Sequence, residues 1–300
     1  MMQMSLHDAL TYGLLTLALI ALWLPIKETS TTSVRPWQAL CLAALGCGVL
    51  FGQVQLLGLL PIAILGISCY CTGSAQYSKS VRIIAGTIML LLSIALSLHL
   101  VPGFSNPKVI DKVILSKGAI PYSKYLNFDK TLVGLFVLGF TFNKLLARRP
   151  QAWWLLLKKA APISALTILV LLLLSFAFGY VRFEPKWSAL VWFWVWSNLF
   201  FTCIAEEALY RGVIQRYLVA GLTKYRYGAG IGLVVAAMLF GLRHYAGGVT
   251  YIVLSTVAGL GYGWVYLRTE RIEAGILTHF LLNCIHFVFF TYPALASAVS

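Results

Sequence analysis

The sequence predicts an all-α fold, a polytopic transmembrane helical bundle with about ten membrane segments. Hydrophobic residues make up 60% of the 300-residue chain and charged residues 11%, whereas soluble domains are about 45–50% apolar and 25% charged. Mean hydropathy is +0.85. The apolar residues also gather into separate stretches, several of which approach the length of about 20 residues that a helix needs to cross a bilayer.

The expected segments follow one another with short connections. Their ranges are 9–26, 38–53, 55–71, 82–101, 131–147, 161–181, 189–212, 229–246, 249–267 and 272–291. The second and third are joined by almost nothing, which predicts a tight hairpin or a re-entrant pair. In the seventh, alternating tryptophans are separated by residues that are also apolar, so a helix is favoured over a barrel strand.

The chain divides by its motifs rather than by its composition. Residues 1–160 are expected to form membrane segments without a recognised motif, and residues 161–300 a core that carries the chemistry. The first residues lack the basic region of a cleaved signal peptide, so the first segment is expected to be retained as a span. The six cysteines lie in or at the ends of apolar segments without a CxxC pair, which indicates free thiols.

The formal net charge of +14 does not indicate nucleic-acid binding, because the basic residues are spread among short loops. Placing the loop 148–160 in the cytoplasm puts roughly twice as many Lys and Arg, Lys27 among them, on that side as on the other. Both termini then lie on the non-cytoplasmic side. The lysine-rich loop 101–130 is the exception to this bias. Short loops without a retention motif suit an integral protein of a bacterial inner membrane.

Two adjacent acids, Glu206 and Glu207, lie inside the seventh segment, although the chain has only nine acidic residues. A carboxylate at membrane depth costs several kcal/mol and is usually functional. Glu207 and Arg211 are spaced to share a helix face and pair, which leaves Glu206, about 100° away, free for other work. The other acids lie in polar stretches: Asp8, Glu28, Asp111, Asp129, Glu184, Glu270 and Glu273.

Polar residues recur in two later segments. Phe240 and His244 are four residues apart, and His279, Asn283 and His286 line one face of the last segment. Taken singly, each histidine could be an interfacial residue, and the Asn–His pair could merely join helices. Taken together with the two glutamates, they are the groups needed to activate a water molecule and stabilise an oxyanion.

These groups meet only if their helices are offset or tilted, or if the helix of Glu206 continues to about Val219, which its good helix formers permit. A zinc ion on Glu206, His244 and His279 is an alternative, but the sequence contains no HExxH motif. A metal-free site is therefore favoured.

Three motifs occur here in order: EExxxR at Glu206–Arg211, FxxxH at Phe240–His244 and HxxxN at His279–Asn283. Over residues of about 189–291, the chain resembles the CPBP family of type II CAAX prenyl proteases and bacteriocin-processing enzymes. The resemblance implies an intramembrane endopeptidase acting on a membrane-associated protein or peptide in the lipid bilayer.

By the motif match, Glu206 and His244 would activate the water, and His279 and Asn283 would form the oxyanion site. Glu207 and Arg211 would support these groups. The family has been described both as metalloproteases and as glutamate proteases, so the resemblance leaves zinc open. It also leaves the substrate open, because some relatives trim prenylated C-termini and others process or confer immunity to bacteriocins.

The sequence leaves two alternative classes of function. A proton-coupled transporter would use the glutamate and the histidines as a relay, but it should have acids in both halves, and the first six segments show none. A non-catalytic scaffold or immunity protein that keeps the fold should have eroded motifs, and here all three are whole.

Overall fold

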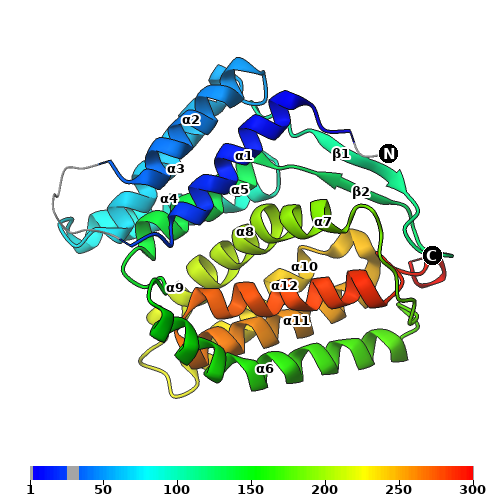
Figure 1. Ribbon diagram of the computed structural model, residues 1–300. Coiled ribbons are helices and arrows are strands. Elements are labelled where there is room, and N and C mark those ends of the chain that lie inside the picture. The colour runs from blue at the N-terminus through cyan, green and yellow to red at the C-terminus, as the bar shows by residue number, and fades with distance from the viewer. Residues whose placement is uncertain (1–2, 26–33, 300) are drawn as a thin grey trace.

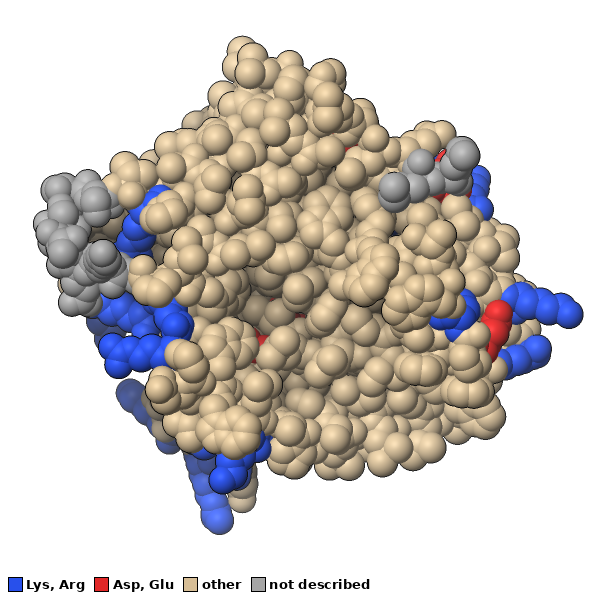
Figure 2. Space-filling model, viewed as in Figure 1, with Lys and Arg blue, Asp and Glu red and all other residues tan. Residues whose placement is uncertain are grey.

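The computed structural model describes residues 3–25 and 34–299, so Lys27 and Glu28 lie outside the described residues. The structure is mostly helical, with the helices standing side by side in a bundle (Figure 1). Lys and Arg gather at the two ends of the bundle, and the surface between them on the face shown in Figure 2 carries few charged side chains. This distribution fits an integral membrane protein.

The α-helices in the first half of the described chain are α1 (Leu6–Ala21), α2 (Pro36–Leu50), α3 (Leu56–Gly73), α4 (Lys79–Ser97) and α5 (Phe128–Phe136). Those in the second half are α6 (Pro150–Ala177), α7 (Val191–Asn198), α8 (Ile204–Glu207), α9 (Arg216–Gly221), α10 (Gly228–Leu242), α11 (Gly248–Thr269) and α12 (Ile272–Phe289). Within the described part of the chain, 5 helices are long and apolar enough to span a membrane. The expectation of about ten full spans is thus borne out in part, since α1, α2 and α10 are apolar but shorter.

The expectation of an all-α chain is wrong for the loop 101–130. It contains an antiparallel hairpin of β1 (Lys108–Val113) and β2 (Tyr122–Tyr125). Its β-branched and aromatic residues favour a strand, and Val109, Ile110 and Tyr122 are buried against the bundle. The hairpin lies at the end of the molecule where both termini also lie (Figure 1).

Two segment boundaries differ from the expected ones. The loop 148–160 is mostly helical, because α6 begins at Pro150, and proline favours the first helical position. The segment expected at 131–147 begins earlier, at Phe128, and its helix ends at Thr141 after a π-helical turn.

One long helix carries the two glutamates. It runs without a break from Val191 to Gly221, through α7, α8 and α9, with π-helical turns at Leu199–Cys203 and Ala208–Gln215. The continuation past Arg211 that convergence of the polar groups required is confirmed. Gln215 is tolerated inside it because its amide donates to the Gly263 carbonyl oxygen at 2.9 Å.

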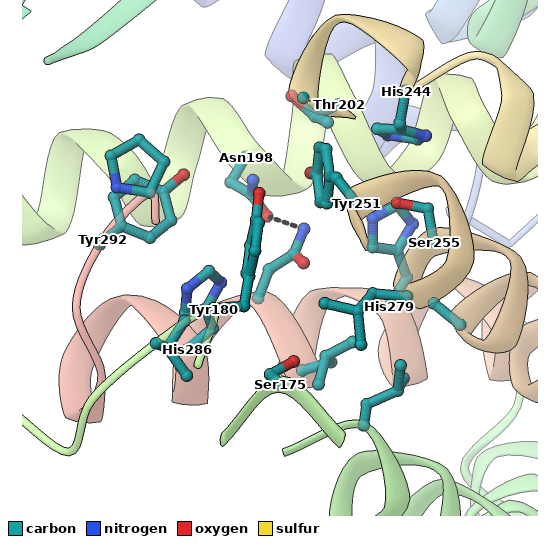
Figure 3. Close-up of a pocket in the computed structure, with 18 of the residues that line it drawn as sticks. Ser175, Tyr180, Asn198, Thr202, His244, Tyr251, Ser255, His279, His286 and Tyr292 are labelled. Carbon is teal, nitrogen blue, oxygen red and sulfur yellow. Dashed lines mark hydrogen bonds between the residues drawn. The ribbon is translucent and has the colours of Figure 1, made fainter. Parts of the chain in front are cut away.

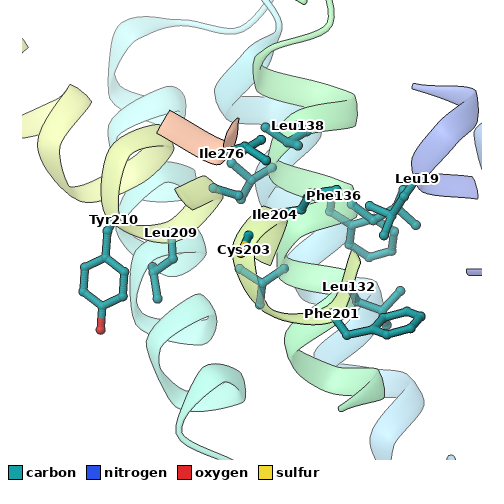
Figure 4. Packing of buried hydrophobic residues seen from close by; sticks show 14 of the residues in the cluster. Leu19, Leu132, Phe136, Leu138, Phe201, Cys203, Ile204, Leu209, Tyr210 and Ile276 are labelled. Carbon is teal, nitrogen blue, oxygen red and sulfur yellow. The ribbon is translucent and has the colours of Figure 1, made fainter. Parts of the chain in front are cut away.

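The core lies where α5 packs against this helix. Leu132 and Phe136 meet Phe201 and Ile204 in an apolar cluster that also receives Ile276 of α12 (Figure 4). A Cβ atom on Gly134 would lie 3.1 Å from the Ala205 Cα, which is tighter than an ordinary contact, so glycine favours this approach of the two backbones. The close approach sets the distance between the first turn of α5 and the glutamates.

The helices α10 and α11 also approach each other at a glycine. A Cβ atom on Gly259 would lie 3.0 Å from the Ala237 Cα. The backbones of α10 and α11 therefore touch, and both helices are held against the long helix.

The charge bias predicts that the hairpin end faces the non-cytoplasmic side. In bacterial expression, alkaline phosphatase fused to the C-terminus should be active, and green fluorescent protein at the same point should be dark. Fusions made within the 222–227 loop, at the other end of the bundle, should give the reverse pattern. The opposite result in both fusions would invert the orientation.

Candidate active site

A cavity of about 370 Å³ lies between α6, β2, the long helix, α11 and α12. The candidate catalytic residues Glu206, His244, His279 and Asn283 line it, and so do Phe240 and His286. His279 and His286 project to the same side of α12, towards the groups on the long helix (Figure 3). The polar groups of the three late segments therefore converge on one chamber, as expected.

Glu207 and Arg211 form the buried pair predicted from their spacing. Their side chains are 0% and 1% exposed, and the Arg211 Nε lies 3.2 Å from the Glu207 Oε2. Arg211 also donates to the Gly259 carbonyl oxygen at 3.0 Å, and its guanidinium lies 4.7 Å from the centre of the Phe240 ring. The charge is thus enclosed by a carboxylate, a carbonyl and aromatic faces, which is how a buried ion pair is tolerated.

His279 connects Glu207 to Glu206. Its Nδ1 lies 2.9 Å from the Glu207 Oε1, and its Nε2 lies 3.9 Å from the Glu206 Oε2. A carboxylate only accepts hydrogen bonds, so the proton of this contact belongs to Nδ1. The imidazole also stacks on the Tyr262 ring at 4.7 Å, which leaves Nε2 as the atom directed at Glu206.

His244 follows the end of α10 and is held differently. Its Nδ1 lies 2.8 Å from the Phe240 carbonyl oxygen, which can only accept, so Nδ1 donates and Nε2 is left as an acceptor. Phe240 lies between the two histidines, with its ring 4.8 Å from that of His244 and 5.8 Å from that of His279. The Phe240 ring therefore packs against both imidazoles and keeps them apart.

Asn283 donates an amide hydrogen to the Asn198 Oδ1 at 3.3 Å, a contact seen in Figure 3. The same amide nitrogen also donates to the Cys203 Sγ at 3.8 Å, a long and weak contact to sulfur. His286, on the same face of α12, lies 3.1 Å from the Thr291 carbonyl oxygen through Nε2. It lines the chamber but is tied to the C-terminal segment.

The expectation that Glu206 is free is wrong. The Lys130 Nζ, from the first turn of α5, lies 2.6 Å from the Glu206 Oε1, and the two side chains are only 11% and 13% exposed. Sequence reasoning assigned Lys130 to the polar loop 101–130. A lysine at the start of an apolar stretch, directly after an aspartate, was the signal that could have drawn attention to it.

The expectation that no acid is buried in the first six segments is also wrong. Asp129 is 1% exposed and accepts from the Asn106 amide at 3.1 Å and from the Lys130 backbone N–H at 2.8 Å. His99 lies 2.7 Å from its other oxygen. These contacts fix the start of α5, so Asp129 orients the lysine that reaches Glu206.

Glu273 is a second acid that the sequence placed in a polar stretch and that the structure buries. It is 2% exposed, and its Oε1 accepts from the Ala147 backbone N–H at 2.6 Å and from the Trp23 indole at 3.0 Å. It ties the end of the fifth segment to the start of α12, far from the chamber lining.

Lys124 is a further lysine missed in the sequence. It comes from β2 and lines the chamber, where its Nζ donates to the Thr202 Oγ1 at 2.7 Å. Burial lowers the pKa of Lys124 to about 8. Only the register of the hairpin against the long helix brings it there.

Residues 185–285 match the model of the type II CAAX prenyl endopeptidase Rce1-like family. This region of the chain is similar to that family. Comparisons with curated proteins and with solved structures gave no match. The matched range covers the long helix and the three motifs, and the similarity indicates a protease that acts on a protein or peptide. Lys124 and Lys130 lie outside the matched range.

The zinc alternative does not fit the arrangement of this Rce1-like site. No group of three His, Cys, Asp or Glu side chains in the described residues is arranged to hold a metal ion. In addition, the Lys130 ammonium occupies one oxygen of Glu206, and a cation there would be repelled by it. No chemical step is therefore assigned to a metal.

Replacing Arg211 by methionine should destabilise the protein by about 3–5 kcal/mol, because the Glu207 carboxylate would remain buried without its cation. The free energy of unfolding in mixed micelles measures this. Lys224→Met, a change on an exposed loop side chain, is the matched control and should stay within about 0.5 kcal/mol. A stable Arg211→Met protein would mean that the pair does not compensate Glu207.

Proposed function

We propose that the protein is an intramembrane endopeptidase, with Glu206 and His244 activating water and His279 and Asn283 stabilising the oxyanion. The observation that carries this proposal is the 3.9 Å separation of the Glu206 Oε2 and the His279 Nε2 in a chamber that also holds His244 and Asn283. The substrate is a membrane-associated protein or peptide, and a bacterial inner membrane is the proposed setting.

Glu206 is suited to act as the base. One carboxylate oxygen is engaged by Lys130, and the other faces the chamber, where a water molecule can donate to it. His244 supports the same water, since its Nδ1 donates to a backbone carbonyl and its Nε2 can only accept. In the attack, the water oxygen bonds to the peptide carbonyl carbon and its proton passes to Glu206.

The proton then passes from Glu206 to the departing amine nitrogen when the C–N bond breaks, so the reaction needs only water. The negative charge on the carbonyl oxygen is met by His279 and Asn283. The Glu207 carboxylate at Nδ1 compensates an imidazolium charge on His279, so Nε2–H can donate to the oxyanion. An N–H of Asn283, released from its weak contact with the Cys203 Sγ, supplies a second donor.

The remaining motif residues hold these groups in place. Glu207 and Arg211 fix the ring of His279 from behind, and Phe240 spaces it from His244. Such support maintains catalytic geometry without touching the substrate.

Glu206→Gln should reduce cleavage by about 10²–10⁴-fold, because the amide cannot accept the proton of the attacking water. Peptide hydrolysis by the purified full chain in nanodiscs measures it, with a proteomic comparison of wild-type and variant membranes to find the uncleaved protein. Glu270→Gln, at an exposed residue after α11, is the control and should retain wild-type activity. Full activity of the folded Glu206→Gln protein would refute the proposal.

Lys130→Met should lower kcat roughly 10–100-fold with little change in KM, since the Glu206 carboxylate loses a charge-assisted hydrogen bond of about 1.5–3 kcal/mol. Lys130→Arg should recover part of kcat, which a merely structural role would not require. Lys117→Met, at an exposed lysine, is the matched control. Equal kcat in Lys130→Met and wild type, with both folded, would remove Lys130 from the site.

A further inference from the structure

The charges around the chamber do not balance. Arg211 is paired with Glu207, and Lys130 with Glu206. Lys124 is left over. Its ammonium donates to a neutral hydroxyl, that of Thr202, and no carboxylate of the described residues forms an ion pair with it. A partly buried ammonium without an anion is costly, so it calls for an anion from outside the chain.

We propose that Lys124 and Thr202 form an anion subsite that binds a carboxylate of the substrate, either its C-terminus or an acidic side chain. This inference rests on the proposed protease function for its role in cleavage, but not for the binding itself. It makes Lys124 a specificity-determining residue rather than a catalytic one.

The position of the subsite favours a substrate group over a stray ion. Both residues line the same cavity as Glu206 and His279. Thr202 precedes Glu206 by four residues, so the two share a helix face and lie about 6 Å apart along the axis. An extended peptide advances about 3.3 Å per residue, which puts the bound carboxylate one or two residues from the bond that is cut.

The chemistry of the two groups fits a carboxylate. The Lys124 ammonium supplies a charge and up to three donors, and the Thr202 hydroxyl can donate to the second oxygen once a ligand replaces it as the acceptor. Lys124 comes from the hairpin and Thr202 from the long helix, so the ligand also bridges the extramembrane element to the bundle. Tyr122 and Asn198 border the same part of the lining.

The test measures binding, so it does not depend on cleavage. A dansylated apolar tripeptide is prepared with a free C-terminal carboxylate, as its C-terminal amide, and as an amide with glutamate at the last position. Each is titrated into the purified full chain in nanodiscs. We expect at least one carboxylate form to bind about tenfold more tightly than the plain amide, equivalent to about 1.4 kcal/mol. A gain for the first form identifies the chain terminus as the source, and a gain for the third identifies an acidic side chain.

Variants locate the subsite. Lys124→Met should remove the preference, Lys124→Arg should keep part of it, and Lys112→Met, on an exposed side chain of the other strand, should keep all of it. Thermal unfolding shows whether each variant is folded. If Lys124→Met does not fold, the carboxylate preference of Lys124→Arg is compared with that of the wild type instead. Equal or absent binding of the carboxylate forms, or an unchanged preference in Lys124→Met, would overturn the proposal.

The pH dependence gives an independent readout. Since burial lowers the pKa of Lys124 to about 8, its charge is present below that pH and lost above it. The ratio of carboxylate to amide affinity should therefore fall as the pH rises through about 8. Lys130, Cys203 and Glu206 are the other titratable groups around Lys124, and the amide peptide corrects for them. A ratio that is flat from pH 6 to about 10 would contradict the assignment to Lys124.

If the carboxylate preference is present but Glu206→Gln cleaves normally, the subsite stands and the proposed chemistry falls. If cleavage depends on Glu206 but all three peptides bind equally, the chemistry stands and the subsite falls. The two proposals therefore fail separately.

Discussion

The structure depends on matching each buried carboxylate of the long helix with a cation. Glu207 finds Arg211 four residues further along the same helix, and Glu206 finds Lys130 on α5. Uncompensated, either acid would cost several kcal/mol in this setting. The second pair draws α5 into the site, so the N-terminal part of the chain, treated in the sequence as separate from the core, supplies one of the charges that the core requires.

Two adjacent residues of the same type are given different tasks by their position. Glu207 is fully enclosed and holds His279 in one orientation, whereas Glu206 keeps an oxygen on the chamber. The two histidines also differ in the group that accepts from their Nδ1 atoms. A carboxylate stands behind His279 and a backbone carbonyl behind His244, so one ring can carry a positive charge with compensation and the other serves as an acceptor.

The side-chain contacts that the sequence could predict lie within single helices. The pairing of Glu207 with Arg211 and the shared face of His279 and Asn283 follow from helical periodicity alone, and both are found. The contact of Lys130 with Glu206 joins residues 76 apart and requires the glycine-mediated approach of α5 to Ala205. No local pattern contains that information. The hairpin was missed for a related reason, because its strands are short and are stabilised by burial against the bundle rather than by a strong alternating pattern.

The hairpin also gives the chamber a direction. Its Lys124 contacts Thr202, which lies about one helical turn before Glu206, on the side of the chamber nearest the chain termini. A substrate held by its carboxylate at Lys124 therefore lies with that end towards the hairpin and its scissile bond deeper in the bundle. If the hairpin end is non-cytoplasmic, as the charge bias predicts, the anionic end of the substrate reaches the chamber from that side. Under the proposed function, the hairpin, the buried ion pairs and the polar face of α12 would act on the same peptide, with recognition near the hairpin and hydrolysis deeper in the bundle.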